Sequence, residues 1–200
     1  MTRTLYCAQR SPYARKVRII LAEKSLVYDP QEIDLAQRSA EFYQLSPLGK
    51  VPVFVDEDGT TIWDSTLIAE YLDEVYPEPR FYPDSIKLEC GKWEEIGDAI
   101  ADCAVDLWME KRKGEQISIA NSLRLQTIID RLLAVCEQKL TNSPCFMGEA
   151  WTIVDIAVLS SLGYLGLRIG EEWKNNYPSL AQWFENLHQR QSVQMTVPIA

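Results

Sequence analysis

Three prolines within seven residues divide this chain into two unlike parts. The stretch PEPRFYP contains Pro77, Pro79 and Pro83. Each proline lacks an amide hydrogen and has a fixed φ angle, so neither a helix interior nor a central strand accepts such a run. We therefore predict a first domain at residues 1–76, a linker at 77–85 and a second domain at 86–200.

The first part combines strand and helix patterns. Thr4–Cys7 is short and apolar, and Val17, Ile20 and Leu21 then recur at helical spacing. The loosely alternating stretch 26–33 predicts a second strand. A connection of this length between two strands suits a crossover helix, which implies that the strands are parallel.

The remainder of the first part predicts a short helix, a hairpin and a longer helix. Residues 40–45 suit one or two helical turns, and residues 51–56 and 60–63 flank a turn that ends in Gly59. Asp64 and Ser65 are good capping residues for the helix that follows. The order β-α-β-α-β-β-α predicts a small α/β domain.

The second part reads as helical throughout. Apolar periodicity predicts helices from 86 to about 113, at 118–140, at 153–168 and at 179–190. Thr152 and Asp155 have the spacing of a capping box, with Trp151 and Ile156 placed for a hydrophobic staple. We expect an all-α domain.

Composition excludes several functional classes. The net charge of −9 disfavours nucleic acid and phospholipid surfaces as partners. A single histidine, His188, makes a Ser-His-Asp triad or a metal site improbable. The most apolar stretch, 151–170, is interrupted by Asp155 and Arg168 and is too short to cross a bilayer.

The cysteines point to a reducing compartment. They form no Cys-x-x-Cys pair and their number is odd, which disfavours a disulfide framework or a zinc knuckle. We therefore expect a cytoplasmic protein without a metal. The five are Cys7, Cys90, Cys103, Cys136 and Cys145.

Three spaced motifs together resemble the cytosolic glutathione transferases. They are Ser-Pro-Tyr at the start of the helix ARKVRIILAEK, then SPLGKVPVF, then DST at the start of another helix. The likeness extends through the linker to the capping box and covers nearly the whole chain. It implies a thioredoxin-like first domain, an all-helical second domain and a two-fold homodimer. The class within the family, similar to bacterial serine-type members, stays open.

The resemblance implies an enzyme that joins the glutathione thiolate to small hydrophobic electrophiles in detoxification. Thioredoxin-like folds often carry Cys-Pro-Tyr-Cys where this chain has Ser11-Pro12-Tyr13-Ala14. Both redox sulfurs are absent, which disfavours a dithiol reductase. Glutathione is then a co-substrate, and no metal is needed.

Ser11 is the candidate that would stabilise the thiolate. By itself, a serine before a helix is most often only an N-cap. The resemblance favours a hydroxyl that donates to the sulfur, aided by the positive end of the helix. Tyr6 is the alternative, because some classes use a tyrosine at the end of the first strand, and Arg10, Tyr13 and Cys7 are weaker candidates.

The other two motifs would bind the rest of glutathione. The resemblance implies a cis bond between Val51 and Pro52, although most X-Pro bonds are trans. The main chain of Val51 would pair with the cysteinyl backbone, and Lys50 could reach the glycyl carboxylate or could simply be solvated. Ser65 and the helix amides would take the γ-glutamyl carboxylate, and Asp64 would meet the ammonium group.

The electrophile would bind between the domains. Side chains from the first helix of the second domain and from the loop around Tyr13 could line this pocket. Aromatic and Met residues at helical spacing more often pack in the core. The candidates are Tyr13, Val105, Trp108, Met109, Arg112 and Tyr164.

Other functions stay open. A non-catalytic regulatory protein of the stringent starvation type would keep the fold without the chemistry. A glutathione-dependent isomerase of the zeta type usually carries Ser-Ser-Cys at the helix start, and reductases of the omega or beta type use a cysteine where Ser11 stands.

Overall fold

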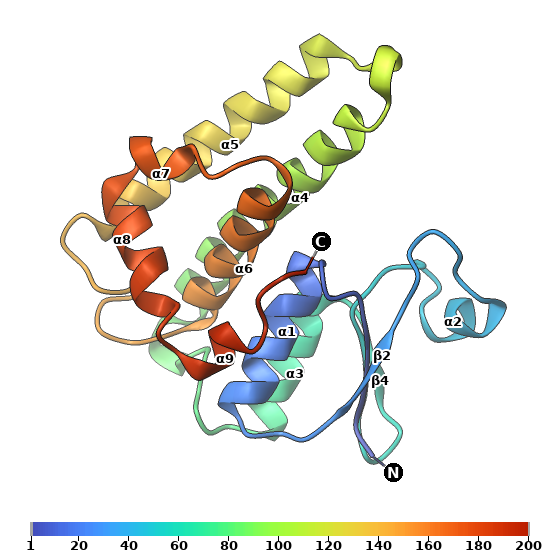
Figure 1. The fold of residues 1–200 in the computed structure, drawn as a ribbon. Helices are drawn as coiled ribbons and strands as arrows, with labels where there is room; N and C mark the ends of the chain where they lie inside the picture. Colours follow the sequence, from blue (N-terminus) through green and yellow to red (C-terminus); the bar gives the residue numbers. More distant parts are fainter. Residues whose placement is uncertain (1, 200) are drawn as a thin grey trace.

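The first half of the molecule is a four-stranded sheet with helices on both faces (Figure 1). The structure is a computed structural model that describes residues 2–199. The strands lie in the order β2-β1-β3-β4, with β1 parallel to β2 and antiparallel to β3. Their bounds are β1 (Thr4–Cys7), β2 (Asp29–Glu32), β3 (Val53–Val55) and β4 (Thr61–Ile62). The expected parallel first pair and the hairpin are confirmed.

The two faces of the sheet are covered unequally. Leu5 and Phe54 belong to the main core together with α1 (Pro12–Glu23) and α3 (Ser65–Val75). Val53 packs on the opposite face with Phe42 of α2 (Ala40–Leu45). Alternate residues of a strand point to opposite faces, which is why neighbours in β3 join different clusters.

Strand β2 closes one edge of the sheet. All four of its residues are exposed and one is Pro30, which cannot donate a ladder hydrogen bond. Proline and polar side chains are typical of an edge strand. The weak alternation in the sequence here reflects this exposure.

The linker is held in place by one carboxylate. Asp73, near the end of α3, accepts hydrogen bonds from the amides of Phe81 (2.7 Å) and Tyr82 (3.0 Å). The Lys24 ammonium lies 3.1 Å from the same carboxylate and also donates to the carbonyls of Tyr76 and Pro79. This cluster fixes how α3 leads into the second half, while the exact domain limits stay a prediction.

Four long helices and several short ones make up the second half. The long helices match the expected ones within two or three residues: α4 (Lys87–Lys111), α5 (Ile119–Leu140), α6 (Ile153–Arg168) and α8 (Pro178–Leu187). The periodicity did not predict the short elements η1 (Asp84–Ile86), η2 (Gly114–Gln116), α7 (Trp173–Asn176) and α9 (Gln191–Gln194). Each has three or four residues, too few to show a helical period.

Helix α6 is the centre of this half. Twelve of its residues are buried, from Ile153 to Leu165. It packs closely on α4 at Gly97, where a Cβ would lie 2.9 Å from backbone atoms of Ala157 and Val158. The expected capping box is confirmed, with the Thr152 amide donating to Asp155 at 3.0 Å.

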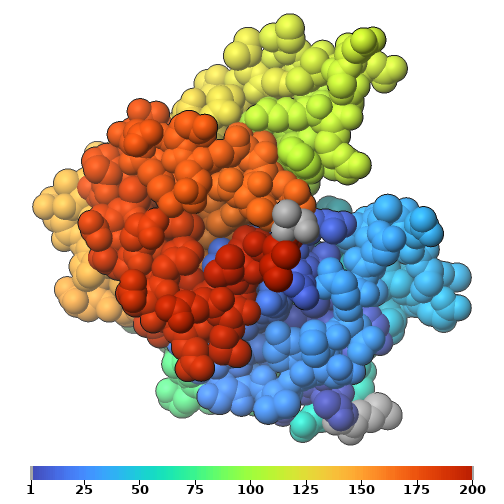
Figure 2. Space-filling view, viewed as in Figure 1, coloured from blue at the N-terminus to red at the C-terminus, as the bar shows by residue number. Residues whose placement is uncertain are grey.

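The C-terminal segment returns to the first half. Arg190 forms an ion pair with Glu23 of α1 at 2.7 Å, and the Met195 carbonyl accepts from Arg18 at 3.3 Å. In the space-filling view the red C-terminal residues lie directly against the blue N-terminal segment (Figure 2). The segment therefore covers part of α1. None of the helices within residues 2–199 has the length and apolarity to span a membrane.

Candidate functional site

Ser11 lies at the start of α1, where the chain leaves β1. Its amide donates to the Ala8 carbonyl at 2.9 Å, and its Oγ accepts from the Ala14 amide at 3.2 Å. Pro12 occupies the first helical position, where no amide hydrogen is required. The N-cap role is confirmed, and it leaves the hydroxyl proton free, since Ser11 Oγ donates to no acceptor within residues 2–199.

The alternatives to Ser11 lie in different surroundings. Tyr6 is half-buried and packs on Phe42, with ring centroids 6.4 Å apart. Burial raises the pKa of Cys7 to about 11, so its thiol is not a reactive nucleophile at neutral pH. The Tyr13 hydroxyl donates to Asp102 of α4, and burial together with that carboxylate raises the tyrosine pKa. Arg10 is half-buried in the loop before Ser11.

The Val51–Pro52 bond is cis, as the resemblance implied. Within the described residues the amide and carbonyl of Val51 form no hydrogen bond, although its side chain is buried. The preceding turn is held by Ser46, whose hydroxyl donates to the Lys50 carbonyl at 2.9 Å. The Lys50 side chain is exposed. An extended peptide could pair with the free main chain of Val51 as an added strand does.

Asp64 and Ser65 begin α3 in different ways. Asp64 is the N-cap, and its Oδ1 accepts from the amides of Thr66 (2.9 Å) and Leu67 (3.4 Å). Ser65 is the first helical residue and is 3% exposed. Its hydroxyl has no hydrogen-bond partner among residues 2–199. One oxygen of Asp64 is therefore committed to the helix, whereas the hydroxyl of Ser65 is free.

The fold brings these three groups to the same end of the sheet, where β1 ends and β3 begins. Tyr6 of β1 is paired with Val53, so the end of β1 lies beside the start of β3, where Val51 is found. Val51 and Ala8 share one cluster, and Ala8 holds the Ser11 amide. Ile62 of β4 pairs with Phe54, and Ser65 follows three residues later, so the start of α3 lies at the same end of the sheet.

The residues expected around the electrophile are spread along α4 and α6. Trp108 lies beneath the Arg168 guanidinium, 5.0 Å from its ring centroid, and Tyr164 is 6% exposed. Burial raises the pKa of Tyr164, while the nearby charges of Arg168 and Arg10 oppose the rise. Val105 is half-buried, whereas Met109 on the last turn of α4 and Arg112, which caps that helix, are exposed.

Sequence reasoning missed the charged residues around these candidates. Asp102 binds Tyr13, Arg168 covers Trp108, and Arg15 is buried one turn after Ser11. Charges on a helix usually mark a solvated face, so only the spacing of Arg15 from Ser11 could have drawn attention to one of them.

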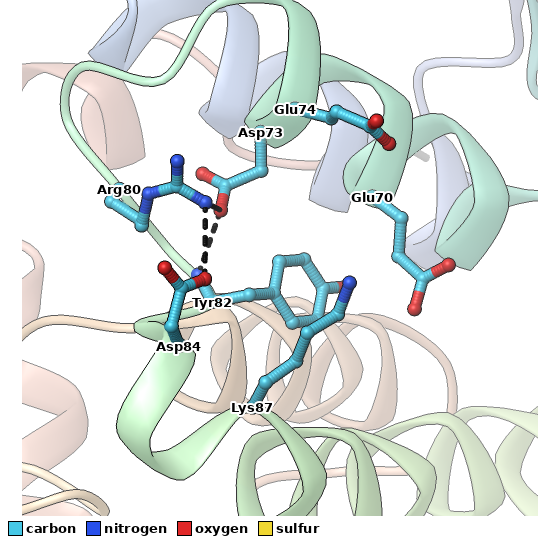
Figure 3. A pocket seen from close by; sticks show the side chains of 7 residues that line it. All are labelled: Glu70, Asp73, Glu74, Arg80, Tyr82, Asp84 and Lys87. Atoms are coloured by element: carbon cyan, nitrogen blue, oxygen red, sulfur yellow. Dashed lines mark hydrogen bonds and ion pairs between the residues drawn. The ribbon is translucent and has the colours of Figure 1, made fainter.

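Two cavities lie away from this end of the sheet. One of about 270 Å³ is lined by α3 and the linker, with Arg80 ion-paired to Asp84 at 3.6 Å (Figure 3). The other, of about 180 Å³, lies beside Cys7, Arg18 and Tyr28. Neither includes Ser11, Val51 or Ser65. In the part of the chain that the structure describes, no group of three or more His, Cys, Asp or Glu residues could hold a metal ion.

Comparison with known proteins gives the family. Residues 5–80 match the family described as glutathione S-transferase, N-terminal domain, and residues 102–191 match its C-terminal domain. The uncharacterised GST-like protein YibF of Escherichia coli is 32% identical over 94% of this chain and 95% of YibF. The chain belongs to the glutathione S-transferase family.

Solved structures agree with the family assignment. A glutathione S-transferase from Methylobacillus flagellatus, with GSH bound, superposes with a TM-score of 0.94 at 34% identity and covers 99% of this chain and all of that one. The glutathione S-transferase fold expected from the sequence is thereby confirmed. A stringent starvation protein A homolog from Pasteurella multocida is also similar, at 30% identity over 76% of this chain and 69% of that protein.

Proposed function

We propose that this protein is a glutathione transferase that joins the glutathione thiolate to small hydrophobic electrophiles. One observation supports this most directly: Ser11, Val51 and Ser65 lie toward the same end of the sheet, each with a polar group that has no protein partner within residues 2–199. A tripeptide with a thiol, two carboxylates and its own peptide groups can supply hydrogen-bond partners to these hydroxyl and main-chain groups.

The Ser11 hydroxyl would hold the thiolate. A free thiol has a pKa of about 8.5, so only about 3% is ionised at pH 7. Lowering that pKa by about 2 units would make the reactive form dominant. The free proton of Ser11 can donate to the sulfur while its Oγ continues to cap α1, and the positive end of the helix adds to the effect.

The rest of the tripeptide would lie along Val51 and α3. The main chain of Val51 would pair with the cysteinyl residue, next to Pro52, and Lys50 would meet the glycyl carboxylate. The Ser65 hydroxyl and amide would take the γ-glutamyl carboxylate at the helix N-terminus. Asp64 keeps one oxygen for the ammonium group.

The electrophile would bind beside the sulfur, between the two halves. Tyr13, Trp108 and Tyr164 are the aromatic residues that we place at this pocket, with Val105, Met109 and Arg112 along α4. A pocket with a broad aromatic wall can bind many different hydrophobic electrophiles, which suits a role in detoxification. Five cysteines without a disulfide fit the reducing cytoplasm as the location.

We also propose a two-fold homodimer through the face of α3 and α4. Leu67 and Leu88 expose 54% and 81% of their surfaces there. Acidic Glu70 and Glu74 of α3 and Lys87 of α4 line the same cavity beside the linker (Figure 3). Such a surface can pair with a rotated copy of itself, acids against lysine.

The test is the titration of bound glutathione in Ser11→Ala. We expect the thiol pKa in the complex to rise by about 2 units and the conjugation rate with an aryl halide at pH 7 to fall about 25-fold, as the ionised fraction falls. Ser118→Ala is the matched control, because Ser118 caps α5 with the same 3.2 Å contact to the amide three residues on. An unchanged thiol pKa in folded Ser11→Ala would refute the role of Ser11.

The second candidate is a regulatory protein that works through protein contacts, which the similarity to the stringent starvation homolog favours. Retention on a glutathione column followed by turnover of an aryl halide or an isothiocyanate supports the enzyme. Retention without turnover, or no retention, supports the regulatory protein.

A further inference from the structure

The charges around the two tyrosines of the proposed electrophile site have opposite signs. The Tyr13 hydroxyl donates to Asp102, and burial together with this carboxylate raises the pKa of Tyr13. Burial also raises the pKa of Tyr164, but the positive charges of Arg168 and Arg10 oppose that rise. The side of the site that contains Tyr164 is therefore positively charged, in a chain whose net charge is −9.

The two arginines come from different halves of the molecule. Arg10 immediately precedes Ser11 in the loop after β1, and Arg168 is the last residue of α6. Tyr164 lies one helical turn before Arg168, so the two side chains share a face of α6. Helix α6 also lies close to α1 at this level, because a Cβ on Gly163 would meet a side chain of α1. The arginines therefore flank the boundary between the halves, where the proposed function places the electrophile.

Arg168 is held in position without a charged partner. Its guanidinium carbon lies 5.0 Å from the ring centroid of Trp108, a cation–π contact that joins α6 to α4. Its Nε is buried and has no hydrogen-bond acceptor among residues 2–199. The acid that follows most closely in the sequence, Glu171, binds Lys174 at 2.9 Å instead. The guanidinium is therefore oriented by an aromatic ring while its charge stays uncompensated.

Neither Arg168 nor Arg10 forms an ion pair within residues 2–199, whereas Arg3, Arg80 and Arg190 do. A shortage of acids does not explain this, since the chain has 29 acidic residues against 20 basic ones. Two like charges beside one phenol repel each other, and an anion bound between them would remove the repulsion. A guanidinium matches a planar carboxylate with two parallel hydrogen bonds, so a carboxylate suits this position.

We propose that the electrophile carries a carboxylate, and that Arg168 and Arg10 bind it. This rests on the proposed function and narrows its acceptor from hydrophobic molecules in general to those with an apolar body and one anionic group. The apolar body would lie against Trp108, which the Arg168 guanidinium already covers. The Tyr164 hydroxyl can donate a further hydrogen bond to the carboxylate.

Glutathione does not supply this anion in the proposed function. Its two carboxylates go to Lys50 and to Ser65, and its thiolate goes to Ser11. The acceptor is the other reactant, so a third anionic group beside α6 has to belong to the acceptor.

The carboxylate anchors the acceptor and takes no part in bond making. With an aryl halide, the sulfur bonds to the ring carbon that bears the halogen, and the carbon–halogen bond then breaks so that halide leaves with the electron pair. With an α,β-unsaturated acid, the sulfur bonds to the β carbon, the double-bond electrons move to the α carbon, and that carbon takes a proton from water. In both reactions the arginines hold the reacting carbon beside the sulfur.

The test uses two aryl halides of the same shape, a chloronitrobenzoate and the corresponding benzamide. The kcat/KM of each is divided by its uncatalysed rate with glutathione, and the ratio of the two results is the preference for the carboxylate. Both compounds meet the same thiolate, so the preference cancels any change in the sulfur itself. We expect a wild-type preference above about 10-fold, which Arg168→Met lowers about 10-fold, mainly through the KM of the benzoate.

Three further variants show whether charge and position matter. Arg10→Met removes the second arginine and should lower the preference by a similar factor; it carries the test alone if Arg168→Met does not fold. Arg168→Lys keeps the charge without the two parallel hydrogen bonds and should retain part of the preference. Arg131→Met is the matched control and should leave the preference unchanged, because Arg131 is exposed on α5 and forms no ion pair within residues 2–199.

The outcomes separate this inference from the proposed function. A wild-type protein that accelerates neither reaction refutes the proposed function. A wild-type protein that accelerates both, with a preference that Arg168→Met and Arg10→Met leave unchanged, overturns the carboxylate site alone. An equal loss in Arg131→Met also overturns it, because general attraction by positive charge would then suffice.

Calorimetry with glutathione alone distinguishes the two sources of a carboxylate. We expect Arg168→Met to change the glutathione dissociation constant by less than about 2-fold. A rise of this constant that matches the lost preference would assign the arginines to a carboxylate of glutathione and would overturn the proposal.

Discussion

Asp155 in the helical half and Ser65 in the sheet half are both buried polar residues in the first turn of a helix, and their surroundings differ. Asp155 is fully buried and accepts hydrogen bonds from two amides, one hydroxyl and one indole, at 3.0 to 3.3 Å. Ser65 is 3% exposed, and its hydroxyl has no partner within the described residues.

The difference separates stability from binding. A buried polar group destabilises a protein unless it is hydrogen-bonded, so the interior of the helical half satisfies Asp155 completely. At the end of the sheet, by contrast, Ser65, Val51 and Ser11 keep polar groups that have no partner within residues 2–199. Such groups are tolerated where a ligand completes them, which is why we place the site there.

Removing the satisfied carboxylate should have the largest effect. Asp155→Ala leaves the amides of Phe146 and Thr152 and the indole of Trp183 without an acceptor. We expect the free energy of unfolding to fall by about 4 kcal/mol, measured by urea denaturation with circular dichroism. Asp106→Ala, at an exposed position of α4, should change it by less than about 0.5 kcal/mol. A loss below 1 kcal/mol for Asp155→Ala would show that the hydrogen bonds accepted by Asp155 contribute little to stability.

The contact between α4 and α6 gives the next largest effect. In Gly97→Ala the new methyl group would meet the backbone of Ala157 and Val158 at 2.9 Å, which should lower stability by about 1–3 kcal/mol. Gly91→Ala lies on the same helix with nothing within 4 Å of its Cβ and should be neutral or slightly stabilising. Equal unfolding midpoints for the two variants would contradict the close packing.

Asp56, a buried carboxylate of the sheet half, extends the comparison to the pH dependence of stability. Burial raises the pKa of Asp56, but hydrogen bonds from Tyr76, the Glu57 amide and Tyr71, together with the Arg3 charge, outweigh it and lower the pKa overall. The stability that Asp56 contributes is therefore present above its unfolded pKa, near 3.9, and is lost as pH falls through the folded value.

Asp56→Asn should lower the free energy of unfolding by about 2 kcal/mol at neutral pH. Between about pH 5 and pH 2 its stability should also fall less steeply than that of the wild type, because one depressed carboxylate no longer titrates. Urea denaturation at a series of pH values measures both. Parallel curves for the two proteins would show that Asp56 does not contribute to the acid sensitivity.

The smallest effect on stability should come from Ser65→Ala. Its hydroxyl binds no group of residues 2–199, so the unfolding free energy should change by less than about 0.5 kcal/mol. The glutathione dissociation constant, measured by calorimetry, should rise about 5- to 30-fold. Ser85→Ala, on the exposed turn η1, should change neither quantity. A stability loss without any loss of affinity would place Ser65 with Asp155 as a structural residue.

The sequence predicted the elements well where local chemistry decides them. Ser11 predicted the start of α1 as its N-cap, and Thr152 with Asp155 predicted the start of α6 as a capping box. Short elements such as α7 and α9 escaped, because four residues show no period.

The candidate site was predictable only as residue types at fixed spacings. Ser11, Val51 and Ser65 could be named from their motifs, and Ser11 proved to cap the helix as its chemistry requires. Which hydrogen-bonding groups of each residue the fold leaves free could not be known beforehand, because the partners come from distant parts of the chain.

Local sequence alone determined the strand-helix order, the proline linker and the caps, because each depends on backbone preferences within a few residues. Tertiary structure alone decided that Lys16 and Lys24 pair with carboxylates while Arg15 pairs with none among residues 2–199. Arg15 and Lys16 are neighbours in α1 and Lys24 caps its C-terminus, yet the carboxylates that pair with Lys16 and Lys24 come from residues at least 49 positions away.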